Sequence, residues 1–95
     1  METVERLQSW FTAQCDGDWE HSFGIRIGTL DNPGWSVDID LDETELLGRE
    51  FPPARDDRSE NDWVHMFRED SQLKIRCGPS NLAEALSIFC RWAGV

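Results

Sequence analysis

The chain has 95 residues, of which nineteen are acidic and nine are basic, and its formal net charge is −10. This length holds one hydrophobic core, so we expect a single domain over residues 1–95. A hydrophobic fraction of 39% and five Trp exclude a disordered acidic tail. The charge excludes nucleic acid and anionic membranes as direct partners, because their phosphates would repel the chain, and it favours a basic partner.

The sequence shows neither a targeting signal nor a pattern of paired cysteines. No apolar run approaches the roughly 20 residues needed to span a bilayer, and the N-terminus lacks the basic and apolar regions of a secretory signal. The three cysteines, Cys15, Cys77 and Cys90, form no C-x-x-C pair. We therefore expect a cytoplasmic protein with reduced thiols, no disulfide framework, no structural zinc and no cofactor.

A helix is predicted near each end of the chain. Residues 3–14 place apolar side chains at helical spacing, with Thr3 as the N-cap and Gly17 in the left-handed conformation beyond the helix. Residues 82–93 show a second apolar stripe, before which Asn81 and Glu84 match a capping box.

Alternating patterns between the helices predict about five strands. Residues 23–29 and 35–41 flank a Pro-Gly turn, and residues 62–68 and 72–77 form a second hairpin. Residues 44–51 read as a weaker strand, and Pro52-Pro53 with ARDDRSE reads as an exposed loop. The fold class that follows is α+β, an antiparallel meander of about five strands with both helices packed on one face.

The register of the first hairpin decides which face its aspartates occupy. A three-residue loop over residues 32–34, with Gly34 at positive φ, pairs Ile27 with Ile39 and gathers the branched side chains on one face. Asp38, Asp40 and Asp42 then form a ladder on the other face, opposite Gly28, Arg26 and Gly24 respectively. Neighbouring aspartates about 7 Å apart repel each other, and Asp is a poor strand former, so the ladder favours a functional interpretation over a merely solvated face.

The acidity is local. Residues 16–45 hold nine acidic residues and one basic residue, whereas the other 65 residues are nearly balanced. We therefore expect this segment to contact the basic partner. The candidate partner-binding residues are Asp38, Asp40, Asp42, Arg26, Glu43 and Glu45.

The densest polar cluster consists of Asp16, Asp18, Glu20 and His21. It suggests an alternative function as a small enzyme or a metal-binding domain, although the spacing does not match a calcium loop. On a strand, Glu20 and His21 would point to opposite faces, so the competing interpretation is a structural connection with Trp19 at the edge of the core. Nearby acids would also raise the pKa of Cys15, which disfavours thiol catalysis.

Residues 17–41, GDWEHSFGIRIGTLDNPGWSVDIDL, together with SENDW at 59–63 and GPSNL at 78–82, closely resemble immunity-protein family 53 of bacterial polymorphic toxin systems. The resemblance covers essentially the whole chain. It implies an α+β domain, encoded beside a toxin gene, that binds and neutralises the cognate toxin. The family hallmarks transfer to Asp18, Trp19, Glu20, His21, Asp31, Asn32, Gly34, Trp35, Asn61, Asp62 and Trp63.

Charge and resemblance together favour a non-enzymatic inhibitor whose acidic surface docks onto a basic toxin, such as a nuclease with a substrate groove lined by Lys and Arg. Electrostatic steering would then raise the association rate. A monomer or a weak homodimer is expected, and a third possibility, a simple oligomerisation module, predicts a stable dimer without any partner.

Overall fold

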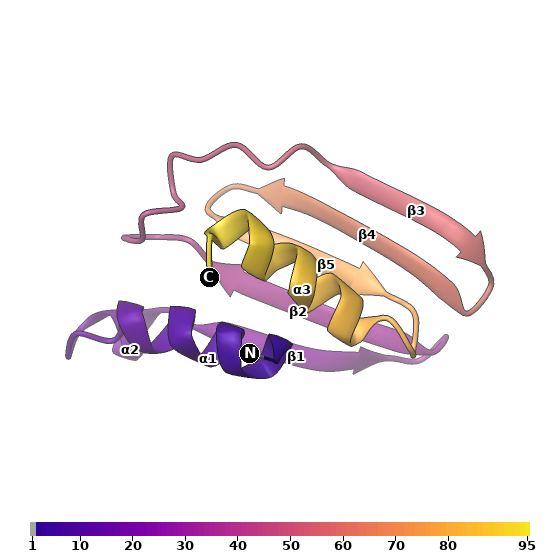
Figure 1. The fold of residues 1–95 in the computed structure, drawn as a ribbon, viewed down its shortest axis with the longest axis horizontal. Coiled ribbons are helices and arrows are strands. Elements are labelled where there is room, and N and C mark those ends of the chain that lie inside the picture. The colour runs from indigo at the N-terminus through magenta and orange to yellow at the C-terminus, as the bar shows by residue number, and fades with distance from the viewer. Residues whose placement is uncertain (1) are drawn as a thin grey trace.

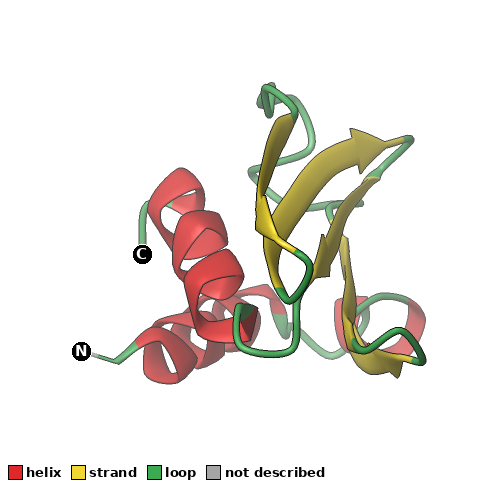
Figure 2. Cartoon of the chain, turned by 90° about the vertical axis from the view of Figure 1, so that its right-hand side faces the viewer, coloured by secondary structure: helices red, strands yellow, loops and turns green. Residues whose placement is uncertain are grey.

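Five antiparallel strands form one sheet, and the two long helices lie together on one side of it (Figure 2). The structure is a computed structural model that describes residues 2–95. Its elements in chain order are α1 (Thr3–Gln14), α2 (Trp19–Ser22), β1 (Ile25–Leu30), β2 (Gly34–Asp40), β3 (Ala54–Ser59), β4 (Asp62–Glu69), β5 (Gln72–Cys77) and α3 (Leu82–Ala93). The α+β fold class is confirmed. Within residues 2–95, no helix is both long enough and apolar enough to cross a membrane.

The strand order in the sheet is β1-β2-β5-β4-β3, so the chain forms two units that meet in the middle (Figure 1). One unit is the β1–β2 hairpin, and the other consists of β3, β4 and β5. Pairing of β2 with β5 joins them, and residues 41–53 connect β2 to β3 at the far edge. The molecule is elongated, with a long axis of 41 Å.

The core lies between the helices and the inner face of the sheet. Alternate residues of the three central strands are buried there, including Ile39, Ile75 and Met66. Trp10 of α1 and Phe89 of α3 meet edge to face, with 5.2 Å between their ring centroids. The apolar stripes that predict the two helices are therefore the surfaces that cover the sheet.

Both long helices span the residues that the sequence predicts, but their caps differ. The residue that caps α1 is Glu2 instead of Thr3, and its N–H donates to Glu5 Oε1 at 3.3 Å. Asn81 does precede α3, but its Oδ1 accepts from Trp63 N at 3.2 Å, so the predicted capping box is wrong. Gly17 adopts the predicted left-handed conformation, with φ 97°.

The strand predicted over residues 44–51 is wrong, because this segment forms a series of turns. Thr44 explains the difference. Its Oγ1 donates to Leu41 O at 2.8 Å and accepts from Leu46 N at 3.1 Å, so side-chain bonds replace the ladder bonds of a strand. Leu46 is fully buried and anchors the segment in the core.

The loop predicted for residues 54–60 is also wrong, since residues 54–59 form β3 at the edge of the sheet. All six residues are exposed, so burial imposes no alternating pattern that a sequence could reveal. Ion pairs stabilise this strand instead. Arg55 pairs with Asp57 at 2.8 Å, and Arg58 pairs with Glu84 of α3 at 2.6 Å.

The first hairpin has the predicted loop length and faces, but its register differs by two residues. Ile25 pairs with Ile39 and Ile27 with Val37, around a loop of residues 31–33. Gly34 does not take the predicted positive φ. It is required for a different reason: a Cβ there would lie 2.4 Å from Cys77 O on β5. The backbone of β5 thus approaches β2 too closely at this position for any side chain.

Gly34→Ala is expected to lower the free energy of unfolding by about 2–4 kcal/mol, because the added Cβ collides with backbone that cannot move independently. Gly28→Ala in the same hairpin is the matched control, since a Cβ there meets nothing within 4 Å. Urea unfolding of both variants checks the prediction. Equal losses of stability would show that the contact with β5 is unimportant.

Candidate functional site

The outer face of the sheet is polar, and cationic side chains on β1 and β5 pair with the aspartates of β2. Asp38 lies opposite Arg26 on β1 and Lys74 on β5. Its Oδ1 lies 3.1 Å from Arg76 Nη1 and 3.5 Å from Lys74 Nζ. The ladder that the sequence predicts, facing one Arg and two glycines, is therefore wrong. Pairing with β5 places two further cations beside it, and Asp42 lies beyond the end of β2.

Asp40 is held most firmly of these aspartates. Only 5% of the residue is exposed, and its two oxygens accept bonds from the Arg26 guanidinium at 3.1 and 3.2 Å, from Gln72 Nε2 at 2.7 Å and from Gly24 N at 2.9 Å. Burial alone would raise the pKa of this carboxyl, but the bonds from Arg26, Gln72 and Gly24 together hold it below its ordinary value. Asp40 therefore ties β1 to β2 and β5.

Acidic residues gather instead at one end of the molecule, where three segments meet. We define the acidic end as residues 15–23, 41–50 and 69–71. Its nine acidic residues are accompanied by one basic residue, Arg49. The nine are Asp16, Asp18, Glu20, Asp42, Glu43, Glu45, Glu50, Glu69 and Asp70.

Hydrogen bonds fasten the three segments of the acidic end together. Trp19 Nε1 donates to Asp42 O at 2.8 Å, and Trp10 Nε1 donates to Glu45 Oε1 at 2.8 Å. Ser71, in the turn between β4 and β5, accepts from Leu41 N at 2.8 Å and donates to Asp42 Oδ2 at 2.9 Å. These hydrogen bonds thus fix the positions of the three segments of the acidic end relative to one another.

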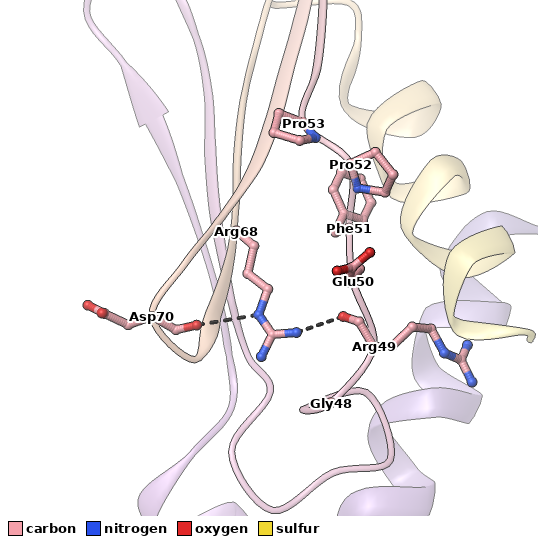
Figure 3. Close-up of a pocket in the computed structure, with 8 residues that line it drawn as sticks. All are labelled: Gly48, Arg49, Glu50, Phe51, Pro52, Pro53, Arg68 and Asp70. Atoms are coloured by element: carbon pink, nitrogen blue, oxygen red, sulfur yellow. Dashed lines mark hydrogen bonds between the residues drawn. The ribbon is translucent and has the colours of Figure 1, made fainter.

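Arg68 of β4 binds backbone carbonyls in the middle of the 41–50 segment (Figure 3). Its guanidinium donates to Arg49 O at 2.7 Å and also to Leu47 O. Through Nε it reaches Asp70 O at 3.4 Å. The Arg68 guanidinium donates to backbone carbonyls. Within residues 2–95, it therefore forms no ion pair with the exposed carboxylates of the acidic end. A hollow of about 570 Å³ lies beside Arg68, between Asp70 and residues 48–53.

Several carboxylates of the acidic end are open to a partner. Within residues 2–95, the structure records no hydrogen bond or ion pair to five exposed acidic side chains here, which are Asp18, Glu43, Glu50, Glu69 and Asp70. Asp18 and Glu43 line a second hollow of about 320 Å³, together with Trp19 and His21. No local sequence signal marks Glu69 and Asp70, because only the fold brings their turn beside Leu41 and Asp42. Glu50 lies just outside the acidic segment of residues 16–45.

Within the cluster of Asp16, Asp18, Glu20 and His21, the carboxylates of Asp16 and Glu20 have a structural role. Residues 19–22 form the short helix α2, so the strand that we predicted to begin at Phe23 starts two residues later. The two oxygens of Glu20 accept from Asp16 N and Gly17 N at 3.0 and 2.9 Å, and Asp16 Oδ1 accepts from the amides that begin α2. Bonds to Trp19 and Asp18 amides lower the pKa of Asp16. Among residues 2–95, no group of three or more His, Cys, Asp or Glu is arranged to hold a metal.

All three cysteines are free, and Cys77 and Cys90 are buried in the core. Burial raises the pKa of the Cys77 and Cys90 thiols. Desolvation is also the main cause that raises the pKa of Cys15, followed by the charges of Glu20 and Asp16. All three thiols are thus disfavoured as nucleophiles.

The remaining sequence motifs meet at the opposite end, where they join the turns to α3. Trp35 Nε1 donates to Pro79 O at 3.0 Å, and Gly78 N donates to Trp63 O at 2.9 Å. Asn81, which is almost fully buried, accepts from Trp63 N and donates to Asp62 Oδ1 at 2.9 Å. Hydrogen bonds therefore link the TLDNPGW, SENDW and GPSNL motifs to one another at this end of the molecule.

Comparison with protein families links these motifs to a known group. The family model of immunity protein 53 matches residues 4–94. This chain belongs to the immunity protein 53 family. Curated proteins and solved structures gave no significant match. The resemblance inferred from GDWEH and TLDNPGW is thus confirmed, and the family name implies a toxin partner for the chain.

Asp40→Ala is expected to lower the free energy of unfolding by about 2–3 kcal/mol, because it leaves Gly24 N–H and the Gln72 amide without their acceptor. Arg26→Gln is the control. It removes a half-exposed cation from the same pair and is expected to cost under about 1 kcal/mol. Urea unfolding at neutral pH measures both, and a larger loss for the Arg26 variant would contradict this assignment.

The contribution of Asp40 is also expected to depend on pH. Because its folded pKa lies below the ordinary value of 3.8, the stabilisation is present above about pH 5. It is lost as the pH falls below 3.8 and through the folded pKa. The stability difference between the native protein and Asp40→Ala should therefore shrink between pH 6 and pH 3, and a constant difference would contradict the prediction.

Proposed function

We propose that this chain neutralises a cognate protein toxin without catalysis, by binding a positively charged surface of the toxin with the acidic end. Membership of the immunity protein 53 family is the observation that supports a toxin as the partner. The concentration of exposed, unpaired carboxylates at one end supports the choice of surface. The proposed site of action is the cytoplasm of the producing cell, where a toxin would otherwise reach its target.

Charge is the physical basis of the proposed recognition. Nine acidic side chains within one end of a small domain create a negative field that attracts and orients a basic partner before contact. A nuclease fits this description, because a groove that binds nucleic acid must present Lys and Arg to phosphates. The proposed inhibitor would occupy that groove or the surface beside it.

The residues proposed for this contact differ in part from those that the sequence suggests. Asp42, Glu43 and Glu45 remain, joined by the free carboxylates at the same end. Asp38, Asp40 and Arg26 are already engaged in pairs on the sheet, so their proposed contribution is to hold β1, β2 and β5 in register. The family hallmarks at the opposite end are proposed to support the fold, leaving partner specificity to other positions.

Glu43→Gln/Asp70→Asn should lower the association rate constant with the toxin by roughly 3- to 10-fold at low salt, because both acids belong to the acidic end. Asp31→Asn/Glu60→Gln makes the same change in net charge with exposed residues outside the acidic end, and should have a smaller effect. The probe is the inactivated toxin domain encoded beside this chain, measured by stopped-flow fluorescence between about 50 and 500 mM NaCl.

The native association rate should fall steeply over this range, whereas dissociation should change little. Equal effects of the two double variants would contradict the acidic end as the docking surface. Absence of binding to the neighbouring toxin domain at every salt concentration would contradict the proposed function itself.

A further inference from the structure

The two edges of the sheet differ in how they are protected against another strand. Edge strands expose unpaired backbone groups, and proteins commonly guard them with charged side chains. β3 is guarded in this way, because four of its six residues are charged and carry ion pairs such as Arg55 with Asp57. β1, at the other edge (Figure 1), contains one charged residue, Arg26, which is drawn back onto Asp40.

The backbone of β1 is available for pairing. Asp40 N donates to Gly24 O at 3.0 Å, and ladder bonds in an antiparallel pair alternate along the strand. The even-numbered residues of β1 therefore bond to β2, while the amides and carbonyls of Ile25, Ile27 and Thr29 point away from it. Within residues 2–95, β2 is the only strand paired with β1.

An apolar groove runs alongside this edge, between β1 and α1. Val4, Leu7, Gln8 and Phe11 line it from the helix, and Ile25 and Ile27 line it from the strand, around a volume of about 280 Å³. Val4 is 57% exposed and Ile27 47% exposed. Such exposure of branched side chains beside an unprotected edge is unfavourable in an isolated domain and is typical of an interaction surface.

The groove continues into the acidic end. Phe11 packs against Trp19 with 6.0 Å between ring centroids, and Trp19 lines the hollow that contains Asp18 and Glu43. An occupant of the groove thus reaches strongly negative surface at the end near Phe11. This favours a basic occupant over a second copy of this chain, which carries the same charge of −10.

We infer that an extended segment of the cognate toxin adds to the sheet as a sixth strand along β1. This inference rests on the proposed function and specifies how the partner is held. Backbone bonds to Ile25, Ile27 and Thr29 would supply affinity, and alternate apolar side chains of the segment would enter the groove. Basic residues at the Phe11 end of the segment meet the acidic end. The acidic end would thus steer the toxin toward this chain, and the adjoining β1 edge and groove would hold the bound segment.

The test uses the double variant Ile27→Gln/Thr29→Pro, which we call the groove variant. The first change removes an apolar contact in the groove. The second removes an N–H that points away from β2, a position where an edge strand tolerates Pro. Val95→Gln is the control, because Val95 is another exposed apolar residue, 37% exposed, outside the groove. Circular dichroism melting verifies that each variant folds, and Ile27→Gln alone serves if the proline variant does not.

The probe is again the inactivated toxin domain encoded beside this chain. The groove variant should bind at least 10-fold more weakly through faster dissociation, with the salt dependence of association retained, while Val95→Gln binds like the native protein. Hydrogen exchange of the native complex should show protection of the Ile25, Ile27 and Thr29 amides on binding.

Three outcomes would overturn the inference. Salt-dependent binding in which these amides stay unprotected and the groove variant binds normally would refute the sixth strand but retain the proposed function. Absence of any binding would refute both. Protection of the same amides in a dimer of the isolated chain, seen by analytical ultracentrifugation, would assign the edge to a second copy instead.

Discussion

The antiparallel pairing of β2 with β5 is the contact on which the other features of the molecule depend. It joins the β1–β2 hairpin to the β3–β4–β5 unit across more than thirty residues of sequence. The same pairing brings the turn at Ser71 onto Leu41 and Asp42, and sets Lys74 and Arg76 beside Asp38. It also demands Gly34, whose missing side chain admits the Cys77 carbonyl. The core, the register and the acidic end all follow from this one interface between strands.

That interface also divides the acidic residues into two groups with different physical roles. Asp38 and Asp40, within the sheet, lose much of their hydration and are compensated by cations and amides, so they contribute to stability and specify the register. The five exposed carboxylates at the acidic end that have no recorded partner within residues 2–95, among them Glu43 and Asp70, keep their hydration, so their charge extends into the surrounding solvent. One end of the molecule can therefore carry a strong negative potential without weakening the core.

The sequence patterns were most reliable where burial is one-sided. The stripes over residues 3–14 and 82–93 predict both long helices, and alternation predicts β2, β4 and β5 almost to the residue. The patterns were misleading where burial gives no signal. β3 is exposed throughout, so its charges read as a loop, whereas residues 44–51 contain buried Leu46 and read as a strand although Thr44 satisfies their backbone locally.

By itself, the sequence determined the α+β class, the helix faces, the family and a surplus of negative charge, because these depend on local periodicity, motifs and composition. Only the tertiary structure decided which acids share a surface. Asp31, Asp38 and Asp40 belong to the acidic segment of the sequence but not to the acidic end, whereas Glu69 and Asp70 join that end from a distant part of the chain. The physical reason is that electrostatic potential depends on distances through space, and those distances are set by strand pairing that no local pattern encodes.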